Sequence, residues 1–198
     1  MRADALQNRE RLLAAATTMF SEHGLDVSVG EIADAAGIGR ATVFRNFPTK
    51  DHLIAAVVSE RMSEAAAAAG KLLESETDDA EIVFKLIEDI AGRQQANRAL
   101  LEVLSEEWFA YPEMQAAHAE LLGAVDAVLE RGKRAGSVRP EVTSDDVLVL
   151  LKGMCMNPAI FDASNATAGL RYLELVRAAI TTPAFSRPLG GVPTLPRG

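Results

Sequence analysis

The sequence predicts an all-α fold, in which a three-helix unit at the N-terminus is followed by a larger helical bundle. Apolar residues recur three and four positions apart along much of the chain, which is the spacing that lines one face of a helix. Glycine and proline residues interrupt this spacing at intervals typical of helix ends. The composition agrees, because alanine is abundant and only 5% of the 198 residues are aromatic.

The first helix is expected to run from about Gln7 to His23. Its apolar residues lie at positions 12, 13, 16, 19 and 20 and share one helix face. Gly24 follows, and a glycine just after a periodic run is typical of a helix end.

The next segment predicts a short helix that opens with a capping box. Ser28 and Glu31 are spaced so that the hydroxyl accepts from the backbone N–H of Glu31, while the carboxylate accepts from the N–H of Ser28. Apolar residues at 32, 33 and 36 supply a buried stripe. Gly37 suits the left-handed conformation that ends a helix, so a tight turn is expected there.

A second short helix is expected from Arg40 to Phe47, because Pro48 pushes the residue before it out of helical geometry. Thr49 is then a candidate N-cap for a long fourth helix, with Asp51 in its positive first turn. The three-helix unit is predicted to bury one set of apolar side chains: Leu12, Leu13, Ala16, Phe20, Ile32, Ala33, Ile38, Val43 and Phe47.

Two short helices joined by a glycine turn are typical of a helix-turn-helix, which presents its second helix to the DNA major groove. Arginine side chains there can bind guanine edges or phosphates, and a threonine can contact a thymine methyl group or a phosphate. For Phe44, groove contact and simple packing are both open. Helical spacing buries positions 43 and 47 and exposes Arg40, Ala41, Thr42, Arg45 and Asn46.

The segment from Arg9 to Val57 resembles the N-terminal DNA-binding domain of the TetR family of bacterial transcriptional regulators. The resemblance runs through RLLAAATTMFSEHG and then EIADAAGIGRATVFRNFPTKDHL. It implies that Lys50 contacts a DNA phosphate. Phe44 stands where the family usually has a tyrosine whose hydroxyl contacts a phosphate, so that contact does not carry over. His52 stands where glutamate is more frequent.

The net charge of −8 lies outside the N-terminal segment. Residues 1–50 carry six basic and six acidic side chains, whereas residues 51–198 carry 14 basic and 22 acidic ones. A neutral N-terminal unit is compatible with DNA binding, because local potential steers the encounter. The balance argues against non-specific coating of nucleic acid and against binding to a membrane surface.

Several classes of protein are excluded by what the sequence lacks. It has no run of 18 apolar residues and no apolar segment typical of a signal peptide, so we expect a soluble, cytoplasmic protein. Cys155 is the single cysteine, so neither an intramolecular disulfide nor a cysteine-based metal site is expected. No glycine-rich phosphate loop, nucleophile motif or metal-ligand spacing is present, so we expect no enzyme activity, no cofactor and no metal.

The remainder of the chain is expected to be helical. Asp78 and Glu81 open one helix, residues 98–109 form another, and a long helix begins at Pro112 and ends near Gly136. A start signal at residues 143–146 opens a helix to about residue 156, and a last helix ends near Ile180.

The helix of residues 145–156 is apolar on nearly every side, which indicates burial on all sides. One side can face its own domain, and the other needs a partner. The resemblance implies that the last two helices pack against their copies in a homodimer, as a four-helix interface. The candidate interface residues are Leu148, Leu151, Tyr172, Leu175, Val176 and Ala179.

The resemblance also implies a small-molecule effector held inside the C-terminal bundle, which shifts the fourth helix and changes the separation of the two DNA-binding units. Apolar residues are the usual lining of such sites, so a hydrophobic ligand with little or no charge is favoured. For each candidate taken singly, core packing is the favoured interpretation. The candidates are Phe84, Ile87, Trp108, Phe109, Met114, His118, Met154, Cys155 and Phe161.

The domains expected are a helix-turn-helix domain at 1–50, a ligand-binding and dimerisation domain at 51–182, and a disordered tail rich in proline and glycine at 183–198. The favoured function is a dimeric repressor that leaves a pseudo-palindromic operator in double-stranded DNA when a ligand binds. One alternative is a DNA-binding regulator without small-molecule control, or an activator. A remote alternative is a helical enzyme with a coincidental helix-turn-helix-like segment.

Overall fold

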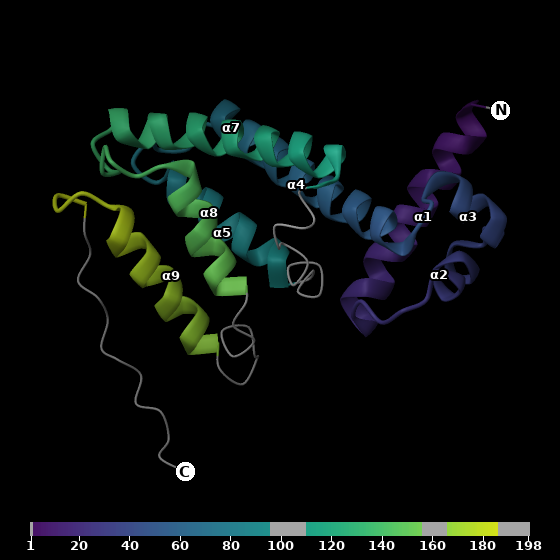
Figure 1. Ribbon diagram of the computed structural model, residues 1–198. Coiled ribbons are helices and arrows are strands. Elements are labelled where there is room, and N and C mark those ends of the chain that lie inside the picture. The colour runs from purple at the N-terminus through teal and green to yellow at the C-terminus, as the bar shows by residue number, and fades with distance from the viewer. Residues whose placement is uncertain (1, 96–109, 156–165, 186–198) are drawn as a thin grey trace, which may run out of the picture. The chain divides into compact units, whose positions relative to one another are not determined.

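The computed structural model describes residues 2–95, 110–155 and 166–185, which form eight helices and one isolated antiparallel bridge (Figure 1). The predicted all-α fold is confirmed for this part of the chain. In order, the helices are α1 (Arg2–His23), α2 (Val29–Ala36), α3 (Arg40–Asn46), α4 (Lys50–Glu74), α5 (Ile82–Gln95), α7 (Pro112–Arg134), α8 (Ser144–Cys155) and α9 (Ala166–Ile180).

The described residues divide into two compact units. The N-terminal unit comprises residues 2–64 and 110–120, and the C-terminal unit comprises residues 65–95, 121–155 and 166–185. Helices α4 and α7 therefore each contribute residues to both units.

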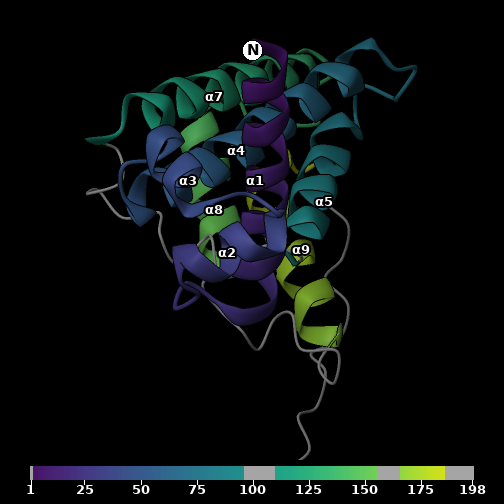
Figure 2. The same ribbon diagram turned by 90° about the vertical axis from the view of Figure 1, so that its right-hand side faces the viewer.

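In the N-terminal unit, α2 packs against both α1 and α3 (Figure 1, Figure 2). Helix α1 begins at Arg2, five residues before the expected start, since no glycine or proline interrupts that polar segment. All nine side chains predicted for the core are buried, and Phe20, Ile32 and Val43 are completely so. This core fixes the orientation of α3, because Val43 and Phe47 are buried in it and hold one side of that helix against the rest of the unit.

In the C-terminal unit, α8 packs against both α5 and α9. The unit buries the apolar side chains of Ile82, Leu86, Leu129, Leu151 and Ile180. The turn after α7 is held to the end of α9, because the N–H of Arg139 donates to the carbonyl of Ile180 at 2.9 Å and Val138 forms a bridge with Thr181.

Helix α5 begins at Ile82, after the predicted opening residues Asp78 and Glu81. The later start arises because Asp78 instead accepts from the N–H of Ala80 at 2.9 Å in a turn.

The starts of α7 and α8 and the end of α7 follow the predicted signals. Helix α7 begins at Pro112 and is followed by Gly136 with a φ of 74°. Thr143 caps α8, since its hydroxyl accepts from the N–H of Asp146 at 3.2 Å and the carboxylate accepts from the N–H of Thr143 at 2.9 Å. The helix predicted at 98–109 lies outside the described residues, as do residues 186–198 of the predicted tail.

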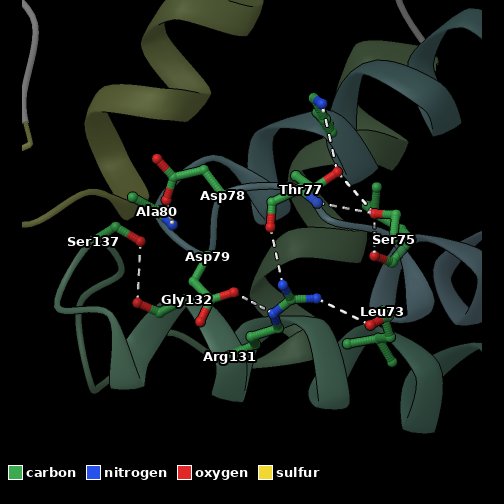
Figure 3. A network of polar contacts seen from close by, with 11 residues as sticks. Leu73, Ser75, Thr77, Asp78, Asp79, Ala80, Arg131, Gly132 and Ser137 are labelled. Atoms are coloured by element: carbon green, nitrogen blue, oxygen red, sulfur yellow. Dashed lines mark hydrogen bonds and ion pairs between the residues drawn. The ribbon is translucent and has the colours of Figure 1, made fainter.

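Arg131 of α7 connects that helix to the segment after α4 (Figure 3). Its Nη1 donates to the carbonyl of Leu73 at 3.0 Å and its Nη2 donates to the carbonyl of Thr77 at 2.9 Å. Its Nε pairs with the carboxylate of Asp79. The cation thus caps the last turn of α4, where the helix carbonyls lack intrahelical partners.

None of the described helices is both long enough and apolar enough to cross a membrane. Within the same residues, no three His, Cys, Asp or Glu side chains are grouped closely enough to bind a metal ion.

Candidate nucleic-acid interface

Helix α2 opens with the predicted capping box, which is confirmed. The backbone N–H of Glu31 donates to Oγ of Ser28 at 3.2 Å. The carboxylate of Glu31 accepts from the backbone N–H of Ser28 at 2.8 Å and from its hydroxyl at 2.7 Å. These hydrogen bonds from Ser28 favour the charged carboxylate and hold the pKa of Glu31 below its ordinary value of 4.5.

The lowered pKa of Glu31 makes the stability of the N-terminal unit dependent on pH. The contribution is present above the ordinary value of 4.5 and is lost as the pH falls through the lowered pKa. Glutamine can keep the capping geometry without titrating. We therefore expect thermal melts between about pH 3 and 7 to show the advantage of wild type over Glu31→Gln disappear on acidification. A difference in melting temperature that stays constant over this range would contradict the assignment.

The turn between α2 and α3 is held by backbone and side-chain hydrogen bonds. Gly37 adopts the predicted left-handed conformation, with φ 64° and ψ 37°, and the N–H of Ile38 donates to the carbonyl of Ala33 at 2.9 Å. From α1, Nη2 of Arg11 donates to the carbonyl of Ala36 at 2.7 Å. A cation at the C-terminal end of α2 is favourable for the dipole of that helix, so Arg11 helps to hold α1 against α2.

Helix α3 is the candidate recognition helix, and its two sides differ in burial. Val43 and Phe47 point into the core of the N-terminal unit, as predicted. Gly39 occupies its N-cap position and provides no side-chain hydrogen bond. The remaining side chains include a half-exposed Thr42 and five exposed residues: Arg40, Ala41, Phe44, Arg45 and Asn46.

The exposed side of α3 is ordered by short-range contacts. Nη2 of Arg45 donates to the hydroxyl of Thr42 at 3.0 Å, and Nδ2 of Asn46 donates to the carbonyl of Thr42 at 2.8 Å. The side chain of Phe44 is 49% exposed, so packing inside the protein covers only half of it. Together with Arg40, these residues form a surface with two guanidinium groups, an amide, a hydroxyl and an aromatic ring.

Helix α4 begins beside this surface, and Lys50 is its first residue. The ammonium of Lys50 donates to the carbonyl of Leu25 in the turn between α1 and α2. An ammonium group has three donors, so two are left for a phosphate. Neither this contact nor that of Arg11 was predicted, because both connect residues 25 positions apart and carry no local sequence signal.

Thr49 caps α4 with an unusual partner. Its hydroxyl accepts from the N–H of His52 at 3.3 Å and lies 2.8 Å from Nδ1 of the same residue. The imidazole thus takes the place that a glutamate has in a capping box. Its ring also meets the edge of Tyr111, at a centroid distance of 5.0 Å, within the N-terminal unit.

Two known protein families match separate parts of this chain. Residues 12–57 match the family described as bacterial regulatory proteins of the tetR family. Residues 78–179 match the C-terminal domain of SbtR-like transcriptional regulators. The chain belongs to the TetR family. It is a transcriptional regulator with a helix-turn-helix DNA-binding domain, and the resemblance inferred from residues 9–57 is confirmed.

Relatives and solved structures similar to this TetR-family regulator are consistent with the family assignment. A helix-turn-helix regulator of Mycobacterium bovis is 27% identical over 143 residues, or 70% of this chain and 74% of that protein. The TetR regulator SCO0520 of Streptomyces coelicolor has a similar structure, with a TM-score of 0.65 and 26% identity over 88% of this chain and 99% of that one. A TetR regulatory protein of Mycobacterium vanbaalenii gives a TM-score of 0.64 and 29% identity, over 91% of this chain and 99% of that one.

The effector-site candidates of this TetR-family regulator fall in both units. Phe84 and Ile87 are buried on α5 in the C-terminal unit, and the guanidinium of Arg177 lies 3.8 Å from the ring centroid of Phe84. On α7, Met114 is buried and His118 is half-buried, both in the N-terminal unit. Trp108, Phe109 and Phe161 lie outside the described residues, as do the side chains of Met154 and Cys155.

The dimer-interface candidates on α8 and α9 differ in burial. Leu151 and Val176 are only 2% and 3% exposed, so they pack inside the C-terminal unit of a single chain. Leu148 and Tyr172 are half-buried, and the hydroxyl of Tyr172 donates to the carbonyl of Leu150 at 2.7 Å. Leu175 is 45% exposed and Ala179 is also exposed. Two further exposed apolar residues, Val149 and Leu170, were not among the candidates.

Proposed function

We propose that this regulator is a dimeric repressor that binds a pseudo-palindromic operator with α3 and releases it when a small hydrophobic ligand binds the C-terminal bundle. The observation that supports this most directly is the sidedness of α3, which is anchored by buried Val43 and Phe47 and presents polar side chains outward. In the proposed division, residues 1–50 bind DNA, and residues 51–182 bind the ligand and form the dimer.

The outward side of α3 has the chemistry needed to read a major groove. Arg45 is suited to a guanine edge, and its hydrogen bond to Thr42 reduces the conformational freedom that it would lose on binding. Asn46 is suited to an adenine edge, and Ala41 and the ring of Phe44 are suited to thymine methyl groups.

Dimerisation is supported by apolar surface on α8 and α9. Val149, Leu170 and Leu175 are 68%, 65% and 45% exposed, although they lie on helices whose other sides form a core. Contiguous exposed apolar patches are typical of surfaces that bind a partner, and in the proposed dimer these side chains belong to such a patch. A two-fold axis through such a surface pairs the two DNA-binding units, and the operator then shares this symmetry.

The experiment that tests the proposal is selection of bound duplexes from a random library by the purified protein, with Arg45→Ala and Arg134→Ala run in parallel. Arg134 is an exposed arginine in the last turn of α7 and serves as the charge-matched control. We expect a pseudo-palindromic consensus that Arg134→Ala retains and Arg45→Ala relaxes at one position in each half-site. Absence of any enriched sequence at moderate salt would overturn the proposal.

Ligand control is a separate part of the proposal and has its own test. A ligand that binds the folded protein and not the unfolded chain raises the melting temperature. A thermal-shift screen of small hydrophobic molecules should therefore find stabilising compounds that also weaken operator binding, since the two effects are coupled reciprocally. Compounds that stabilise the protein without changing operator affinity would favour the alternative, a regulator without small-molecule control.

Lys50→Ala is expected to weaken binding to all DNA sequences alike and to lower the salt slope of log K by about one unit. The reason is that one phosphate contact would be lost. Loss of the hydrogen bond to Leu25 alone would weaken binding but would leave the number of released counterions unchanged. Lys71→Ala, which removes an exposed lysine from the last turn of α4, is the control and should leave the slope unchanged. An unchanged slope for Lys50→Ala would remove this residue from the phosphate contacts.

A further inference from the structure

A close contact between Gly30 and Arg40 joins the two helices of the helix-turn-helix. A methyl group at position 30 would lie 2.6 Å from Nη2 of Arg40, 2.8 Å from Cζ and 3.0 Å from Nε. These are the three nearest atoms, so the guanidinium lies flat against the backbone of the first turn of α2. No other residue type leaves this space open, because every other side chain begins with a Cβ.

The backbone of Gly30 does not itself require glycine. Gly30 lies inside a regular helix and has no positive φ, unlike Gly37. Glycine is among the poorest helix formers, so its presence here costs helix stability. Gly123 of α7 is a useful comparison, because it is also helical but is exposed and has no atom within 4 Å of a methyl group built there.

Apart from its contact with Gly30, the Arg40 side chain has few contacts with the described residues. It is exposed, and none of the described residues forms a hydrogen bond or an ion pair with its guanidinium. Its direction therefore rests on packing against α2. In a helix-turn-helix the first helix crosses the DNA backbone while the second enters the groove, so an arginine lying back on the first helix is directed toward a phosphate.

We propose that Gly30 is a positioning residue for DNA binding: its missing side chain lets Arg40 lie against α2, where it is aimed at a backbone phosphate and not at a base edge. This inference rests on the proposed binding of α3 to an operator. The two arginines of α3 then have different roles: Arg40 contributes to affinity for DNA, and Arg45 determines the sequence preference. Alanine at position 30 forces the guanidinium out of this position, and the order that it had before binding is lost.

The test measures equilibrium binding to the duplex enriched by the wild-type protein, at several salt concentrations, for Gly30→Ala, Arg40→Ala and the double variant. We expect Gly30→Ala to weaken binding about three- to tenfold, from the cost of ordering one long side chain. We expect Arg40→Ala to lower the salt slope by about one unit, and Gly30→Ala to leave it nearly unchanged because the cation is still present, both with an unchanged consensus. The double variant should bind no more weakly than Arg40→Ala.

Protein stability separates this role from a structural one. Gly30→Ala and the control Gly123→Ala should both raise the melting temperature by about 2 °C, because alanine is the better helix former. Only Gly30→Ala should also weaken DNA binding.

Undiminished DNA binding by Gly30→Ala would overturn the inference. So would an equal loss of affinity when Gly30→Ala is introduced into the Arg40→Ala variant. A changed base preference in Arg40→Ala would overturn the phosphate assignment. A wild-type protein that enriches no sequence would instead contradict the proposed function itself.

Discussion

Leu175→Glu is expected to convert the proposed dimer into folded monomers and to abolish binding to a two-half-site operator. Leu175 is 45% exposed on α9, so a carboxylate there is hydrated in a single chain and changes the melting temperature little. At a two-fold interface the same carboxylate is buried close to its own copy, which costs about 3 kcal/mol or more. Light scattering after size exclusion measures the mass, and circular dichroism measures the fold.

Leu151→Glu provides the contrast, because Leu151 is 2% exposed inside the C-terminal unit. A charge at that position is expected to unfold the unit, with a loss of at least about 4 kcal/mol. Both variants lose operator binding, but only Leu175→Glu keeps its helical signal and melting temperature. If Leu175→Glu stays dimeric with full operator affinity, the interface lies on a different surface.

Arg131→Ala is expected to lower the free energy of unfolding by about 2–4 kcal/mol. The side chain of Arg131 is 19% exposed, and its guanidinium joins two backbone carbonyls and a carboxylate, all between the end of α4 and the segment before α5 (Figure 3). Without it, the carbonyls of Leu73 and Thr77 lose their partner. Chemical denaturation of the purified protein measures the change.

Two further variants define the role of Arg131. Lys133→Ala removes a neighbouring cation that pairs with Glu130 at 3.1 Å, and its effect should stay below about 1 kcal/mol because the carboxylate is largely exposed. Arg131→Lys should recover only part of the loss, since an ammonium group does not match the planar fork that reaches three acceptors. Equal stabilities of Arg131→Ala and Lys133→Ala would show that the network in Figure 3 contributes little.

The DNA-binding unit could be predicted closely because its signals are local. The capping box of Ser28 and Glu31, the left-handed Gly37 and the stop at Pro48 each act within a few residues of the chain. The hydrophobic periodicity of each helix then identified its core side. Signals of this kind act between residues that are close in the chain, so they are present in the sequence before any tertiary contact forms.

The contacts that join these helices could not be predicted. Lys50 reaches Leu25, Arg11 reaches Ala36 and Arg40 lies against Gly30, and each pair depends on how two helices cross. A charged side chain at an exposed helix position gives no sign of the backbone that it will meet.

Helix α8 shows a different limit of prediction from sequence. Its apolar side chains lie on nearly every side of the helix, so periodicity could not distinguish the side facing its own unit from the side facing away. The structure separates them, because Val147 and Leu151 are buried while Val149 is 68% exposed.

Helix α3 has only seven residues and no side-chain cap at its N-terminus. A helix this short is not stable alone in water, so its order comes from the core beneath it. Mutations that abolish regulation should therefore be found at Phe20 and Ile32, which touch no DNA, as readily as at Arg45. The two classes would differ genetically: a distant stabilising mutation should rescue the buried class and leave the Arg45 class inactive.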